Sequence, residues 1–187
     1  MATPMQKLTP LLNPFIKNRG FSLQSALLAT VLIPLSIAVG FSLYHHYSTQ
    51  LAPNVSFSTL SGQKIELKAL QGKPVLVTFW ASDCPECLKE IPIFTELYEN
   101  YHGKGLEIIA VAMPYDPPNH VIALNQEKHI PYPIALDLDT EVVHAFDNVQ
   151  VTPTTFLINP QGIIDLKIIG KIDFNALKTH IETYIKG

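Results

Sequence analysis

The sequence predicts an α/β domain built on a mixed β-sheet, and three observations support this. Residues 74–80 form a short apolar stretch rich in β-branched and aromatic residues, which indicates a buried strand. Apolar residues at helical spacing follow over residues 85–101, and a second apolar stretch occupies residues 106–113. Strands joined by a helix are expected to be parallel, whereas two later strands flank the turn at residues 159–162 and are expected to be antiparallel.

The other elements follow from the same periodicities. Pro92 is expected to kink the helix at residues 85–101, and Pro133 places its strand at a sheet edge because proline donates no hydrogen bond to a neighbour. In chain order we expect a polar linker at 48–54, a β-hairpin at 55–67, a short turn at 67–73, a loop at 114–118, a helix at 120–128, an edge strand at 132–137, a small helix at 141–146, hairpin strands at 154–158 and 163–169, and a closing helix at 174–186. Alternating strands and helices are typical of an α/β sandwich.

The two cysteines of the chain, Cys84 and Cys87, lie where the first buried strand turns into a helix. Pro85 is tolerated at the first helical position if Cys84 is the N-cap, and Cys87 then lies on the same face, close enough to form a disulfide. The positive end of the helix dipole would stabilise a thiolate on Cys84. We predict a redox-active dithiol rather than half of a zinc site, because zinc needs four ligands and no second ligand pair follows.

Three acids lie close to this pair. Asp83 and Glu86 flank Cys84, and a carboxylate opposes the formation of a nearby thiolate. A weakly stabilised thiolate favours a reductant, so we predict that both acids tune the redox potential. Glu86 is equally explained as a favourable charge at a helix N-terminus. Glu90 lies three residues after Cys87 on the same face and is our candidate base, the alternative being a solvated helix residue.

Charge is distributed unevenly along the chain. It contains 13 basic and 16 acidic residues, but Lys7, Lys17 and Arg19 are the only charged residues before Lys64. The remainder is therefore distinctly acidic. This argues against nucleic acid as a partner.

The apolar stretch at residues 26–44 is long enough to cross a bilayer as a helix. Basic residues before it and aromatic residues after it favour a cytoplasmic N-terminus and an exported C-terminal part. The alternative is a cleaved signal peptide with a weak small-residue site at Ala38-x-Gly40, but the apolar run is longer than a usual signal core. We expect a cytoplasmic segment at residues 1–20, a transmembrane anchor at 21–47 and a globular domain at 48–187.

The order of elements, the segments 79–82, 84–87 and 151–158, and Pro92 together resemble the thioredoxin-like superfamily. More narrowly, they resemble its membrane-anchored thiol–disulfide oxidoreductases of the TlpA/ResA type. The resemblance extends from about residue 53 to the C-terminus. It implies a thioredoxin fold, in which helices flank a mixed central sheet, with an N-terminal β-hairpin and an inserted strand–helix segment near residues 117–137.

The resemblance also implies roles in catalysis. Cys84, at the exposed helix start, is expected to attack a client disulfide, and Cys87 to resolve the mixed disulfide. In the family the acid at the position of Glu90 lies beside the dithiol and shuttles protons.

Substrate-binding residues are implied as well. Thr152 and Pro153 would form a cis-proline loop against Cys84 that pairs with an extended client segment, and Trp80 would pack beside the site or in the core. One departure is clear, because the family usually has Trp where this chain has Asp83. An apolar docking surface is thereby lost and a charge is gained.

The expected partners are client proteins with disulfides and a membrane electron-transfer protein that re-reduces the dithiol. Cytochrome c maturation is one process that the family suggests. We expect a single-pass protein of a bacterial inner membrane whose catalytic domain faces the periplasm or the cell exterior. The Cys84–Cys87 disulfide is the one redox group expected, with no further cofactor and no metal, since the seven histidines form no ligand set by their spacing.

Two other functions remain as alternatives. A peroxiredoxin-like peroxidase would need Pro-x₃-Thr-x₂-Cys, but Val77 and Ala81 occupy those positions ahead of Cys84. A copper-delivering metallochaperone of related fold would have three residues between its cysteines and a distal histidine, whereas only two separate Cys84 from Cys87.

Overall fold

The computed structural model describes residues 32–40 and 50–185, which belong to two compact units divided after His46. In the first unit residues 32–40 form a helix with exposed side chains. Within the described ranges, no helix is long and apolar enough to cross a membrane. The predicted cytoplasmic segment 1–20 and most of the predicted anchor at 21–47 lie outside the described residues.

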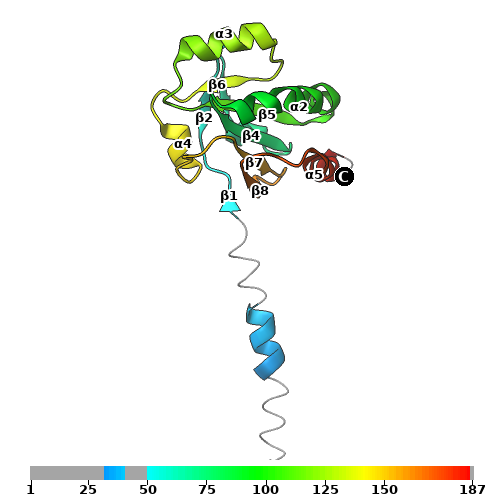
Figure 1. Ribbon diagram of the computed structural model, residues 1–187. Helices are drawn as coiled ribbons and strands as arrows, with labels where there is room; N and C mark the ends of the chain where they lie inside the picture. Colours follow the sequence, from blue (N-terminus) through cyan, green and yellow to red (C-terminus); the bar gives the residue numbers. More distant parts are fainter. Residues whose placement is uncertain (1–31, 41–49, 186–187) are drawn as a thin grey trace, which may run out of the picture. The chain divides into compact units, whose positions relative to one another are not determined.

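The second unit is built on a six-stranded mixed sheet in the order β1-β8-β7-β4-β5-β6 (Figure 1). The strands are β1 (Gln50–Leu51), β4 (Val75–Trp80), β5 (Glu107–Ala112), β6 (Ile134–Leu136), β7 (Thr154–Ile158) and β8 (Ile163–Ile169). β5 is parallel to both β4 and β6, whereas β7 is antiparallel to both β4 and β8. The predicted mixed sheet is confirmed, as is the edge position of β6.

One strand was not expected. Gln50 and Leu51 lie in the predicted linker, but they pair with Ile164 and Ile163 of β8. The linker prediction is therefore wrong for these two residues. Their side chains are exposed and show no alternating pattern, so the sequence contains no signal for a strand here. The backbone groups of an edge strand bind whichever extended segment passes beside them.

Four helices of this unit are labelled α2 (Pro85–Tyr101), α3 (Pro118–Lys128), α4 (Glu141–Ala145) and α5 (Phe174–Ile185). α2 continues through Pro92 for its full length. α3 and β6 together form the predicted inserted segment between β5 and α4. A second, two-stranded sheet pairs β2 (Ser56–Ser58) with β3 (Lys64–Glu66), which confirms the N-terminal hairpin.

Strand β4 separates two hydrophobic cores, because its side chains alternate between the faces of the sheet. Leu76 and Trp80 pack in a core with residues of α2 and α5, including Phe94 and Leu177. Val75, Val77 and Phe79 pack in the other core with residues of α4. All six residues of β4 are buried. The strand is thus fixed from both sides, and the residues that follow it are placed at its carboxyl end.

Candidate active site

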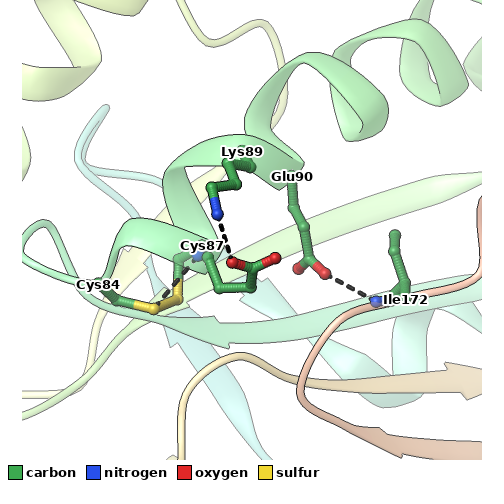
Figure 2. A network of polar contacts seen from close by, with 6 residues as sticks. Cys84, Cys87, Lys89, Glu90 and Ile172 are labelled. Atoms are coloured by element: carbon green, nitrogen blue, oxygen red, sulfur yellow. Dashed lines mark hydrogen bonds and ion pairs between the residues drawn. A yellow bond between two sulfur atoms is a disulfide. The ribbon is translucent and has the colours of Figure 1, made fainter.

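The cysteine pair lies at the N-terminus of α2 and is oxidised (Figure 2). Cys84 is the N-cap and Pro85 the first helical residue, as predicted. The two Cα atoms are 5.3 Å apart, and the backbone N–H of Cys87 donates to Cys84 Sγ at 3.2 Å. Cys84 is half-buried, whereas the side chain of Cys87 is 4% exposed. A partner can therefore reach the sulfur of Cys84 more easily than that of Cys87.

Glu90 is buried one turn further along α2. It is only 2% exposed, and its Oε1 accepts a hydrogen bond from the backbone N–H of Ile172 at 2.9 Å (Figure 2). The solvated-residue alternative is therefore wrong. Burial raises the pKa of Glu90 above the ordinary value, while the Ile172 hydrogen bond opposes this increase and the negative charge of Glu86 adds to it.

The two flanking acids lie at the surface. Glu86 Oε2 accepts a hydrogen bond from Lys89 Nζ at 2.7 Å, and this bond lowers the pKa of Glu86. The Lys89 ammonium offsets the charge of Glu86, so the effect of Glu86 on the cysteines is weaker than its sequence position suggests. Asp83 is exposed beside Cys84. Of the two predicted tuning residues, Asp83 has the more direct access to the dithiol.

The loop at Pro153 precedes β7, which starts next to the end of β4, where Thr154 pairs with Phe79. The Thr152–Pro153 peptide bond is cis, as the resemblance implies. Pro153 is buried, and its carbonyl accepts a hydrogen bond from Gly170 at 2.8 Å. The segment that begins at Gly170 then reaches Ile172, so one stretch of chain contacts both the cis-proline loop and Glu90.

A buried carboxylate holds the residues just before Cys84. Asp116 is 5% exposed, and its two oxygens accept hydrogen bonds from the backbone N–H and the hydroxyl of Ser82, each at 2.6 Å. Asp116 follows the carboxyl end of β5, the strand parallel to β4. The loop between β4 and α2 is thereby tied to the neighbouring strand.

Trp80 packs in the same hydrophobic core as Cys87 and is 4% exposed. It lines a small cavity on the inner side of Cys87, together with Thr78, Glu90 and Tyr132. Burial raises the pKa of Tyr132, and the Glu90 carboxylate adds to this increase. The ring of Trp80 therefore faces the buried side of the site rather than a surface that a client could contact.

A larger cavity lies at the other end of β4. Its volume is about 250 Å³, and Val75, Ile158 and Gly162 are among the residues that line it. Val75 begins β4, whereas the dithiol follows the end of that strand. This cavity is therefore separate from the cysteine site.

Comparison with known proteins identifies the family. Residues 49–167 match the family model of the AhpC/TSA family. The chain is 36% identical over 167 residues to the thiol–disulfide oxidoreductase ResA of Bacillus cereus, which covers 83% of this chain and 91% of that protein. It is 31% identical over 161 residues to ResA of Geobacillus thermodenitrificans, which covers 82% and 91%. The chain belongs to the AhpC/TSA family.

A solved structure supports the fold. The thiol:disulfide interchange protein of Chlorobium tepidum superposes with a TM-score of 0.67 at 23% identity, covering 73% of this chain and 97% of that one. The fold is thioredoxin-like. Together with the ResA relatives, the family makes this chain a protein-disulfide oxidoreductase of the ResA type.

Several residues of this ResA-type site were not predicted from the sequence. From segments that are distant along the chain, Asp116 reaches Ser82 in the active-site loop, whereas Ile172 and Tyr132 reach Glu90. Asp116 is the one with a sequence signal, since an acid directly after a buried parallel strand lies at the edge of the sheet where sites form. Ile172 acts through its backbone, and no side-chain pattern could have indicated that.

Proposed function

We propose that this protein is a membrane-anchored, extracytoplasmic reductant of disulfides in specific client proteins. One arrangement carries the proposal. A half-buried Cys84 at the start of α2 is paired with a buried Cys87, and a buried carboxyl group, Glu90, lies one turn behind it. The accessible cysteine is suited to attack, and the buried one to resolution.

The proposed reaction begins with the reduced dithiol. The Cys84 thiolate attacks one sulfur of the client disulfide, so that a Cys84–client bond forms, the client S–S bond breaks and one client thiolate leaves with the electron pair. Cys87, after losing its proton, attacks Cys84 Sγ. The Cys84–Cys87 disulfide forms and the second client thiolate leaves. The client gains two electrons and the protein loses two.

Glu90 is the proposed proton acceptor for Cys87. The Cys87 thiol must lose a proton before it can attack, and its buried position limits direct access of solvent. Burial raises the pKa of Glu90, and a carboxylate with a raised pKa is a better base than an ordinary glutamate. The Ile172 hydrogen bond holds one of its oxygens in place.

The proposed direction of electron flow rests on the charges around Cys84. Asp83 is exposed and immediately precedes it, and a nearby negative charge opposes the thiolate. Proteins that stabilise the thiolate of their reduced form are strong oxidants, so a charge that opposes the thiolate favours a reductant. The charge is a feature of this chain, because the family usually has Trp at the position of Asp83. Glu86 contributes less, because Lys89 offsets its charge.

The proposed location and partners rest on the sequence. The apolar stretch at residues 26–44 with preceding basic residues favours an anchor in a bacterial inner membrane, with the catalytic domain in the periplasm or at the cell exterior. We propose that a membrane electron-transfer protein returns two electrons by dithiol exchange. Cysteines of apocytochrome c or of metallochaperones are the proposed client groups.

Trapping of mixed disulfides tests the cysteine roles. With Cys87→Ala the mixed disulfide cannot be resolved, so covalent client adducts through Cys84 should accumulate in cells and be visible on non-reducing gels. Cys84→Ala is the matched control and should trap few. Equal trapping by both variants would contradict the assigned roles, and the trapped proteins identify the clients.

The reduction potential tests the direction. Equilibration of the full chain against glutathione buffers should give a value near that of thioredoxin, about −270 mV, rather than near the strong oxidant DsbA at about −120 mV. Asp83→Asn should raise the potential, because the Cys84 thiolate becomes more stable. A wild-type value close to that of DsbA would exclude the reductant proposal.

A further inference from the structure

Two buried polar atoms beside Cys87 have no hydrogen-bond partner within the described part of the chain. They are the indole nitrogen Nε1 of Trp80 and the second carboxyl oxygen of Glu90, Oε2. One is a donor and the other an acceptor, and an unsatisfied buried polar atom costs about 1–3 kcal/mol when fully desolvated. We therefore expect a bound molecule that forms hydrogen bonds with both atoms.

Both residues line the same cavity. Trp80 reaches it from the end of β4 and Glu90 from α2, and the other lining residues include Thr78, Cys87 and Tyr132. The volume open to the centre of a water molecule is about 10 Å³. A single water needs roughly 10–15 Å³ by this measure, so the cavity is matched to one water and too small for an organic ligand.

We propose that one internal water occupies this cavity, accepting a hydrogen bond from Trp80 Nε1 and donating one to Glu90 Oε2. Trp80 is then a positioning residue, which acts on the dithiol through Glu90. The hydroxyl of Thr78 offers a third partner, because it shares one hydrogen bond with Thr155 at 3.0 Å and a hydroxyl has three hydrogen-bonding positions. Buried waters typically make about three hydrogen bonds.

The water complements the contact that Glu90 makes with the backbone. Oε1 is held by Ile172, and the water holds Oε2, so both oxygens are fixed and the ionised form is stabilised. The titratable groups that interact with Glu90 are Glu86 on the same helix and Tyr132 from the segment before β6. Tyr132 stays neutral near pH 7, because burial raises its pKa.

The consequence for catalysis rests on the proposed role of Glu90. A fixed water between Trp80 and Glu90 holds the carboxylate at the cavity that Cys87 also lines. Trp80 thereby contributes to the resolving step without contacting a client. The water site itself does not depend on that role and can be tested in the oxidised protein, where neither sulfur carries a proton.

The test uses the fact that Trp80 is the single tryptophan of the chain. In the full-length oxidised protein labelled with ¹⁵N at the indole, one cross-peak reports on Nε1. Between about pH 4 and pH 9, a range that spans the pKa values of buried glutamates, we expect it to move in one step with the ionisation of Glu90. We also expect a nuclear Overhauser contact between the indole proton and a long-lived water.

Two variants provide matched controls on the same helix. Glu90→Gln should abolish the step, whereas Glu86→Gln, which removes an acid that does not line the cavity, should leave it in place. Trp80→Phe should raise the pKa of Glu90 by roughly half a unit to one unit, because the water that donates to Oε2 loses its own hydrogen-bond donor. The carbon signal of the Glu90 carboxyl group, recorded against pH, measures this pKa.

Each contrary result is decisive. An indole signal that does not follow Glu90 would show that the two groups are not linked, and a signal that follows Glu90 without a water contact would indicate a direct bond. Either outcome overturns the water site. If instead Glu90→Gln leaves the rate of resolution unchanged while the titration behaves as expected, the proton role of Glu90 fails and the water site stands.

Discussion

Glu90 is the residue whose chemistry depends most on its surroundings. It is a carboxyl group on a helix, which is ordinarily solvated, yet it is 2% exposed and has one hydrogen bond to the residues that the structure describes. Retaining an ionisable group in such a place reduces stability, and this is usual where catalysis requires it. Its burial therefore gives both a functional and a thermodynamic prediction.

We predict that Glu90→Gln stabilises the oxidised protein at neutral pH by on the order of 1 kcal/mol, since the amide keeps an oxygen for Ile172 and removes a buried charge. Because the folded-state pKa is raised, the native state binds more protons than the unfolded state above the ordinary value of 4.5. The free energy of unfolding of the wild type should therefore fall as the pH rises from 4.5 to the raised pKa of Glu90. The free energy of unfolding of Glu90→Gln should not show this decrease.

Urea denaturation at acidic and neutral pH measures this difference. Glu86→Gln is the control, because Glu86 is only half-buried and its pKa is lowered rather than raised. The stability gain should be confined to Glu90→Gln and should shrink at low pH. A gain that is the same at every pH would mean that ionisation of Glu90 is not its cause.

At the scale of elements, the active-site loop is held by contacts between neighbouring strands. β4 leads directly to Ser82, and the end of β5 provides Asp116, whose carboxylate accepts two hydrogen bonds from that serine. The cis-proline loop is held in a similar way, because Gly170 after β8 donates to the carbonyl of Pro153. Each of these two loops is thus fixed by the end of another strand.

We predict that Asp116→Asn destabilises the protein by about 1.5–3 kcal/mol, the usual range for a buried hydrogen bond to a charged group. Ser82→Ala should cost less, because the backbone N–H still binds Asp116. Denaturation measures the stabilities, and alkylation of the reduced protein measures whether Cys84 becomes more reactive once the loop is released.

The exposed Asp139 supplies the control for a lost negative charge, and Asp139→Asn should have little effect on either measurement. The double variant at Ser82 and Asp116 should be less destabilised than the sum of the two single changes, because both act on one pair of contacts. Simple additivity would mean that the two residues do not act as a unit.

At the scale of the whole molecule, a globular redox unit follows a segment whose sequence predicts a membrane anchor. We predict that a reporter fused after Gly187 is active only outside the cytoplasm, because Lys7, Lys17 and Arg19 precede the apolar stretch and favour retention of the N-terminus inside. Phosphatase and fluorescent-protein fusions measure on which side of the membrane the C-terminus lies.

A fusion made after Gly20 serves as the control and should report the cytoplasm. Cell fractionation of the full chain should place it with membranes, whereas a cleaved signal peptide would release a smaller soluble protein. Cytoplasmic activity of the fusion after Gly187 would rule out the predicted orientation.

The local motifs could be predicted from the sequence because their physics is local. Cys84, Pro85 and Cys87 are neighbours in the chain, and an apolar strand followed by a capped helix fixes their geometry. The apolar stretch of β4 and the hairpin of β7 and β8 are also local patterns. The N-cap, the disulfide and the mixed sheet were therefore predicted correctly.

The tertiary structure alone decided the environment of these residues. Helical spacing places Glu90 on the face of Cys87, but its burial depends on Ile172, a residue far along the chain. The tie between Ser82 and Asp116, the pairing of β1 with β8 and the cavity beside Trp80 likewise join distant segments. A sequence pattern reports which face a residue occupies, whereas solvation and hydrogen bonding depend on what the rest of the chain packs against that face.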